Sequence, residues 1–111
     1  MKEHILKYIE LKPKVGYNDL VKIFGLSIDN LLKLLDINNY ESYQKYIEFF
    51  DNNGNIIYRE YPYGNWVKRK YNINDKVIYR EHSDGSWHKY EYDNNGELIK
   101  SKDSDGNKYN Y

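Results

Sequence analysis

An internal repeat of 21 residues runs from Phe50 to the C-terminus and limits the folds open to this chain. An aromatic residue opens each copy, at Phe50, Tyr71 and Tyr92, and a turn-forming segment rich in Asn, Asp and Gly follows it. An apolar pair comes next, and the triplet Tyr-Arg-Glu is identical in the first two copies. Agreement at a constant spacing over three copies indicates a repeat architecture in which neighbouring units stack on one another.

Each copy predicts a β-hairpin that a second tight turn joins to the next hairpin. The Asn- and Gly-rich segments suit turns that end in a residue with positive φ, which Gly and Asn tolerate. Between the turns the side chains should alternate, with odd-numbered residues of 87–92 on one face and even-numbered residues on the other. We therefore expect an antiparallel meander of about six strands beginning at residues 43–50, with turns near 51–54, 62–65, 72–75, 83–86, 93–96 and 104–107.

The first forty residues have a different character. They carry 15 of the 24 Ile, Leu and Val residues, whereas residues 41–111 carry 11 of the 14 Tyr and both Trp. Apolar residues at helical spacing predict three helices: one ending at about Lys12 before Pro13, one ending at Gly25, and one capped by Ser27. Asn18 is expected to cap the second helix. The predicted fold is α+β, with a helical module over residues 1–40 and repeats over 41–111 in one continuous body.

The segment from Leu20 to Leu35 resembles a helix-turn-helix, with a short helix, a Gly-containing turn, a Ser cap and a second helix. The resemblance implies a tri-helical module whose third helix offers Asn30 and Lys33 to DNA, since Asn can read adenine and Lys can reach phosphate or guanine. Asp29 would face phosphate repulsion, so a module used only for folding or protein contact remains open. Because a winged helix places a hairpin after its third helix, residues 43–61 are expected to double as the wing.

The third copy resembles the YD repeat of Rhs-type proteins through Tyr90-x-Tyr92-Asp93-x-x-Gly96 and the following Asp103-x-Asp105-Gly106-Asn107. The second copy departs from that pattern, with Asp75 where Gly is usual. Large members of the family wrap many units into a shell around a toxin, and three units are too few to close a shell. The resemblance therefore implies a binding surface, as in short arrays of small phage and mobile-element proteins.

Several kinds of chemistry are disfavoured by composition. The 17 basic and 17 acidic residues give a net charge of zero, which argues against general phosphate-driven nucleic-acid binding. There is no Cys, and no apolar run is long enough to span a membrane, so a cytoplasmic protein is expected. His82 and His88 flank one turn, but only Asp84 offers a third ligand, so we expect no metal. No cofactor or catalytic motif is recognisable, and the protein is predicted not to be an enzyme.

Basic and aromatic residues in and beside the central repeat form the predicted interface. Lys68-Arg69-Lys70 beside Trp66 is the only basic run, and Arg59 and Arg80 occupy equivalent places that should share one side of the sheet. Such surfaces bind nucleic acid or protein, although the arginines could instead pair with Glu60, Glu81 and Glu91 across strands. The predicted binding residues are Arg59, Trp66, Lys68, Arg69, Lys70, Arg80 and Trp87. If the third helix is the binding surface instead, they are Asn30 and Lys33.

These features predict a non-enzymatic binding protein of phage or mobile-element type. It would dock on a host protein or nucleoprotein complex that handles nucleic acid and inhibit it, as an anti-CRISPR protein does. The alternative is a winged-helix transcriptional regulator that contacts DNA through the helix-turn-helix. Nucleic-acid contact through the basic strand also remains open, and no membrane partner is expected.

Overall fold

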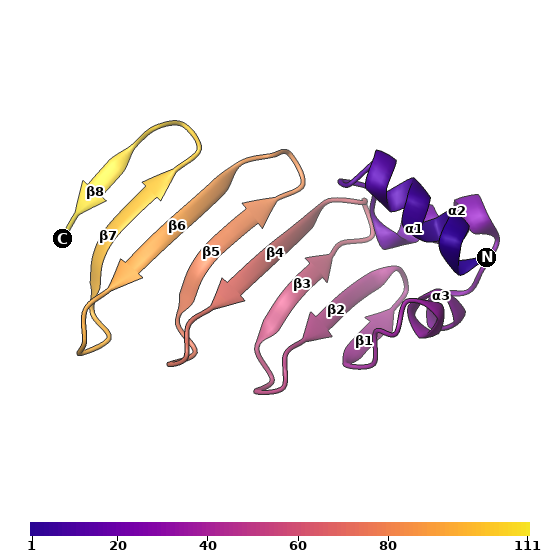
Figure 1. Cartoon of the computed structure of the whole chain (residues 1–111), viewed down its shortest axis with the longest axis horizontal. Helices are drawn as coiled ribbons and strands as arrows, with labels where there is room; N and C mark the ends of the chain where they lie inside the picture. Colours follow the sequence, from indigo (N-terminus) through magenta and orange to yellow (C-terminus); the bar gives the residue numbers. More distant parts are fainter.

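The computed structural model describes residues 1–111 as three helices at one end of an eight-stranded antiparallel sheet (Figure 1). The α+β class is therefore confirmed. The helices are α1 (Lys2–Leu11), α2 (Tyr17–Phe24) and α3 (Ile28–Leu34). The strands are β1 (Tyr40–Tyr43), β2 (Tyr46–Phe50), β3 (Ile56–Glu60), β4 (Trp66–Tyr71), β5 (Val77–His82), β6 (Trp87–Tyr92), β7 (Leu98–Asp103) and β8 (Lys108–Asn110). None of the three helices has the length and apolar character that a membrane span requires.

Local sequence explains how most of the helices begin and end. The Ser27 hydroxyl caps α3 by accepting a hydrogen bond from the Asn30 amide at 3.2 Å, as expected. Gly25 ends α2 in the left-handed conformation, with φ of 65°. The prediction that Asn18 caps α2 is wrong, because the helix begins at Tyr17 and Asn18 lies in its first turn. The cap is instead a carboxylate from the sheet, that of Glu60.

The strands lie in the sheet in chain order, each antiparallel to the next. All six expected turns are present, and the same two backbone hydrogen bonds close each of them. In the first, the Asp51 amide donates to the Asn55 carbonyl and the Gly54 amide donates to the Asp51 carbonyl. Asp75 occupies the glycine position of the third turn with φ of 61°, a conformation that Asp tolerates better than most residues. Each turn is therefore closed by hydrogen bonds within its own residues, and the same turn recurs along the chain.

The sheet has eight strands, whereas the sequence predicted about six. One strand that was not predicted is β1, which the two-residue turn Gln44-Lys45 joins to β2. Both turn residues have positive φ, 48° and 71°, a conformation that usually recruits Asn or Gly. The other is β8, a short exposed edge strand. β1 has neither the apolar alternation nor the Asn or Gly turn by which a strand is recognised in sequence. β8 follows the expected turn at 104–107, but it has only three residues and all of them are exposed.

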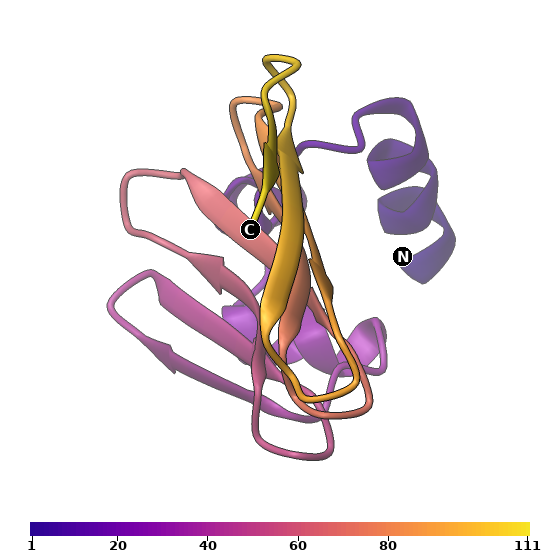
Figure 2. The same cartoon turned by 90° about the vertical axis from the view of Figure 1, so that its left-hand side faces the viewer.

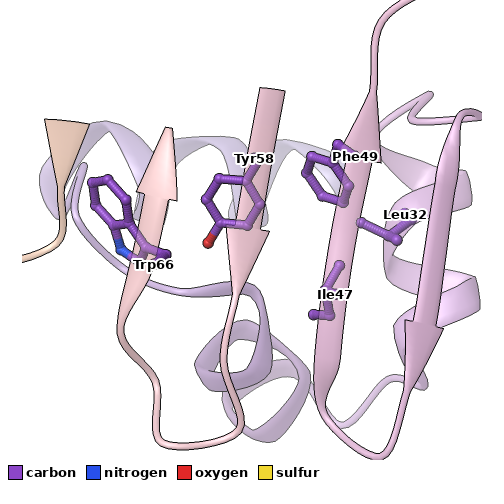
Figure 3. Packing of buried hydrophobic residues seen from close by; sticks show 5 residues of the cluster. All are labelled: Leu32, Ile47, Phe49, Tyr58 and Trp66. Carbon is purple, nitrogen blue, oxygen red and sulfur yellow. The ribbon is translucent and has the colours of Figure 1, made fainter. Parts of the chain in front are cut away.

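The core lies where the helices meet the first strands. Ile5, Leu20 and Leu31 are buried among the helices. A second cluster joins α3 to the sheet, and Figure 3 shows its aromatic members side by side on three neighbouring strands: Leu32, Ile47, Phe49, Tyr58 and Trp66. No residue beyond Trp66 is fully buried. The helices therefore stabilise one end of the sheet, and β5–β8 extend from it without a covering layer.

This arrangement makes the molecule elongated. Its Cα radius of gyration is 16.1 Å, and its extents are 48 × 30 × 25 Å. A compact domain of this length has a radius of gyration of about 13 Å. Figure 2 views the molecule from the β8 end and shows the twist of the sheet. Each strand of β5–β8 thus depends mainly on its immediate neighbours for stability, as in repeat proteins.

Candidate binding site

The strand register assigns the predicted binding residues to two opposite faces of the sheet. Residues directly paired across antiparallel strands share a face. The pairs Glu60↔Trp66 and Tyr58↔Lys68 therefore place Trp66 and Lys68 on the face that packs against the helices. We call this the helix face, and it also carries Lys70 and Trp87. The opposite face, the far face, carries Arg59, Arg69 and Arg80.

Trp66 is a core residue. Only 2% of its surface is exposed, and its indole Nε1 donates a hydrogen bond to the Lys14 carbonyl at 3.2 Å. Trp87 occupies the equivalent place one repeat later and is only partly buried. Trp66 thus stabilises the fold and is not available to a partner, while Trp87 remains accessible.

On the far face, the arginines do not pair with the glutamates considered from sequence. Arg59 pairs with Glu48 at 3.0 Å, and Arg80 donates to the Tyr90 hydroxyl at 3.1 Å. The alternative in which Arg59 and Arg80 pair with Glu60, Glu81 and Glu91 is therefore wrong. Those three glutamates lie on the helix face, across the sheet from the arginines. Arg59 and Arg80 do share one face, as expected.

The two histidines of the central hairpin also lie near each other on the far face. The ring centroids of His82 and His88 are 6.3 Å apart, with the rings nearly perpendicular. His88 also stacks on Tyr90, at a centroid distance of 6.3 Å. The neighbouring Asp84 accepts hydrogen bonds from the Ser86 hydroxyl and amide, which lower the pKa of its carboxyl. No group of three His, Cys, Asp or Glu side chains in the chain is placed to hold a metal ion.

A row of lysines covers the part of the helix face that the helices leave open. Strand pairing places them together on β4, β6, β7 and β8, and all are exposed. We call this set the lysine face: Lys68, Lys70, Lys89, Lys100, Lys102 and Lys108. None of these lysines forms an ion pair, since the two ion pairs of the protein involve Lys2 and Arg59. Aromatic rings lie beneath some of them, with Lys89 Nζ 4.9 Å from the Trp87 ring centre.

Three of these lysines are placed against one another. Lys89 is directly opposite Lys102, and Lys102 is directly opposite Lys108. Like charges directly opposite on neighbouring strands destabilise a sheet. The two acidic residues of the same stretch, Glu81 and Glu91, are too few to neutralise the row. The lysine face is therefore an unfavourable arrangement for the isolated sheet and a favourable one for an anionic partner.

The residues predicted to contact DNA through the helix-turn-helix lie on a different surface. Asn30 and Lys33 are exposed on α3, which lies at the β1 end of the sheet, away from β6–β8 (Figure 1). Asp29 beside them accepts a hydrogen bond from the Tyr40 hydroxyl at 2.6 Å. The structure thus separates the α3 surface from the lysine face, and the two surfaces can be tested independently.

Sequence reasoning missed a buried carboxylate site that joins the helical module to the sheet. Glu60 is fully buried and accepts hydrogen bonds from the Tyr17 amide at 2.7 Å, the Asn18 amide at 2.9 Å and the Tyr58 hydroxyl at 2.6 Å. Gly16 makes room for it, since a Cβ on Gly16 would lie 3.0 Å from the Glu60 carboxylate. The repeated Tyr-Arg-Glu triplet was visible in sequence, but the partner of Glu60 lies 43 residues away.

We expect this site to make the protein sensitive to alkali. Burial, followed by the neighbouring Glu60, raises the pKa of Tyr17 and Tyr58 above the usual value of a phenol. The folded state therefore keeps these protons at a pH where the unfolded state has lost them. Their contribution to stability is complete below a pH of about 10 and is lost as the pH rises toward the folded-state pKa values. Denaturant titrations at increasing pH should show this loss, with a shallower dependence in Tyr58→Phe.

No protein-family model matches the chain, and no curated protein sequence shows significant similarity to it. The geometry alone therefore defines the candidate functional surfaces. They are the lysine face with Trp87 and the exposed surface of α3. The far face contributes Arg69 and Arg80, whose direct pairing also brings like charges together. Of these surfaces, the lysine face has the largest unpaired charge.

Proposed function

We propose that the protein is a non-catalytic binding protein that docks through its lysine face on an acidic surface of a host complex that handles nucleic acid, and thereby inhibits that complex. An anti-CRISPR protein is the concrete form of this proposal. Its main support is a run of three unpaired lysines on β6–β8. Lys102 lies directly opposite Lys89 on one side and directly opposite Lys108 on the other. An arrangement that weakens the isolated sheet is typical of a functional site.

The uncovered strands supply the second requirement of an interface, partly buried aromatic groups. Trp87 and Tyr79 lie on the same face as the lysines, with Lys70 Nζ 5.6 Å from the Tyr79 ring centre. Aromatic side chains concentrate binding energy, while surrounding charges speed association and select the partner. The helical module then serves to stabilise the first strands of the sheet.

Charge reversal on the lysine face tests this proposal. We expect Lys100→Glu with Lys102→Glu to weaken capture of the partner at least tenfold, because four units of charge change on a surface that faces an anionic partner. Wild-type and variant proteins should be used as bait in lysate of the native host, with bound proteins quantified by mass spectrometry across salt concentrations. Wild-type binding should fall steeply with salt.

The matched control reverses two exposed lysines on the helices, Lys7→Glu with Lys22→Glu, which changes the net charge equally. This control should retain the partner. Equal loss in both double variants would mean that net charge, and not the lysine face, governs capture. Retention by both would contradict the proposal.

The second candidate function is a winged-helix transcriptional regulator. One observation favours it: a hairpin follows α3 directly, as a wing follows a recognition helix. That hairpin is β1–β2, and not the hairpin over residues 43–61 that the sequence predicted as the wing. For this function we expect retention on a column of random duplex DNA and its loss in Asn30→Ala with Lys33→Ala. Loss of partner capture in that α3 variant, with no effect of lysine-face reversal, would replace the binding-protein proposal by this one.

A further inference from the structure

The carboxylate site that holds the helical module has a second copy one repeat later. The first carboxylate site consists of Tyr58, Glu60 and Trp66, and the second of Tyr79, Glu81 and Trp87. In both, the tyrosine hydroxyl donates to the glutamate, at 2.6 Å in the first and 2.9 Å in the second. In both, the glutamate is paired directly with the tryptophan across the strands.

The surroundings of the two sites also correspond. The Trp66 amide donates to Ser83 Oγ at 3.2 Å, and the Trp87 amide donates to Ser104 Oγ at 3.1 Å. A lysine ammonium lies over each indole, 4.7 Å from the Trp66 ring centre and 4.9 Å from that of Trp87. The second site thus repeats the backbone hydrogen bond, the side-chain hydrogen bond and the lysine–indole contact of the first.

The contacts of the first site show what such an arrangement of residues binds. Its carboxylate accepts the first two amide protons of α2, and the Tyr17 ring packs against the Tyr58 ring at a centroid distance of 5.3 Å. The indole of Trp66 holds the approaching loop through the Lys14 carbonyl. A carboxylate at this position satisfies two orphan amides and complements the positive end of the helix dipole. The first site is therefore a receptor for the start of a helix.

The second site makes none of these contacts within the chain. Glu81 accepts only the Tyr79 hydroxyl, and the indole nitrogen of Trp87 donates to no group of the protein. The same open hollow is lined by Tyr17 and Tyr58 of the occupied region and by Tyr79, Glu81 and Trp87 of the second site. The vacant site is thus continuous with the interface that already binds α2.

We propose that the second carboxylate site binds the N-terminus of an α-helix of the partner protein, in the way that the first site binds α2. This inference rests on the proposed function and specifies the chemistry of the partner. The α2 N-terminus of a second copy of this chain is not free to bind there, because its own Glu60 already holds it. A nucleic acid fits less well, since Glu81 would repel its phosphates.

The differences between the two sites select the partner helix. Ile47 and Phe49, which pack beside the first site, are replaced by Lys68 and Lys70 at the corresponding positions beside the second. The bound helix should therefore carry Asp or Glu in and before its first turn, where the helix dipole also favours them. An aromatic residue at its first position would pack edge to face against Tyr79, as Tyr17 packs against Tyr58.

A peptide titration of the whole protein tests this inference. The probe is a synthetic peptide with the sequence of residues 12–26, carrying Lys12→Glu and Lys14→Glu to match the lysines of the second site. We expect saturable changes in the NMR signals of the Trp87 indole and the β6 amides. Glu81→Gln should lower the affinity about tenfold or more, because a neutral amide cannot form the charge-assisted hydrogen bonds that a carboxylate forms with two backbone amides. The peptide with native lysines should bind more weakly than the acidic peptide.

Glu91→Gln is the matched control, because it removes a carboxylate from the same strand face outside the second carboxylate site. It should leave the affinity unchanged. Equal affinity for wild-type and Glu81→Gln proteins, or signal changes confined to β1–β3, would overturn the inference, as would the absence of any saturable change. Lys100 and Lys102 do not belong to this site, so their reversal tests the proposed function separately.

Discussion

Replacing Glu60 by alanine should detach the helical module from the sheet and lower the free energy of unfolding by about 3–5 kcal/mol. The truncation leaves three donors without their acceptor, namely the amides of Tyr17 and Asn18 and the hydroxyl of Tyr58. Each buried donor left unpaired costs about 1–3 kcal/mol. Glu60 is fully buried, so water cannot replace it without rearrangement of the interface.

Denaturant unfolding followed by circular dichroism, with amide spectra to map the detached region, measures this effect. The matched control is Glu81→Ala, which removes the same residue with the same tyrosine partner from the next repeat. We expect a loss below about 1 kcal/mol there, as for most surface substitutions. Similar losses in the two variants would contradict the assignment of Glu60 as the residue that joins the two parts of the fold.

The second large effect is expected for Trp66→Ala, which should cost about 3–5 kcal/mol, the usual range for removing a buried aromatic side chain. Trp66 is 2% exposed and packs beside Tyr58 at a ring-centroid distance of 6.1 Å. Its loss leaves a cavity next to the first carboxylate site and frees the Lys14 carbonyl from its hydrogen bond.

Trp87→Ala is the corresponding control, because Trp87 holds the same place in a repeat that no helix covers. We expect it to cost less than half as much stability while weakening partner binding. Equal losses of stability, measured by the same denaturant titration, would mean that the uncovered repeats have a core that the burial pattern does not show.

The local features of the fold were predictable because each depends on a few neighbouring residues. The turns at 51–54 and 93–96 follow from Asn and Gly, which adopt positive φ, and the strands follow from the constant spacing between turns. The cap on α3 was equally visible, since Ser27 and Asn30 are three residues apart.

The features that escaped prediction depend on distant partners. The sequence presents Trp66 and Trp87 as equivalents, yet only Trp66 is buried, because the helices are long enough to cover the first strands alone. In the same way, the repeat pattern does not reveal that Glu60 caps a helix 43 residues away while Glu81 has no such partner. Of the lysine face, Lys68 and Lys70 were among the predicted binding residues. The other four, Lys89, Lys100, Lys102 and Lys108, were missed because they join the first two only through the strand register.

The dependence of each strand of β5–β8 on its neighbours alone has a consequence for how such a gene can change. A deletion or duplication of 21 residues would remove or add one whole unit. The product would have a sheet two strands shorter or longer, with the helix-covered end untouched and every turn still closed by its own hydrogen bonds. Related proteins can therefore differ in the length of the exposed sheet by whole units. Point substitutions on the exposed face would change what the sheet contacts without changing its length.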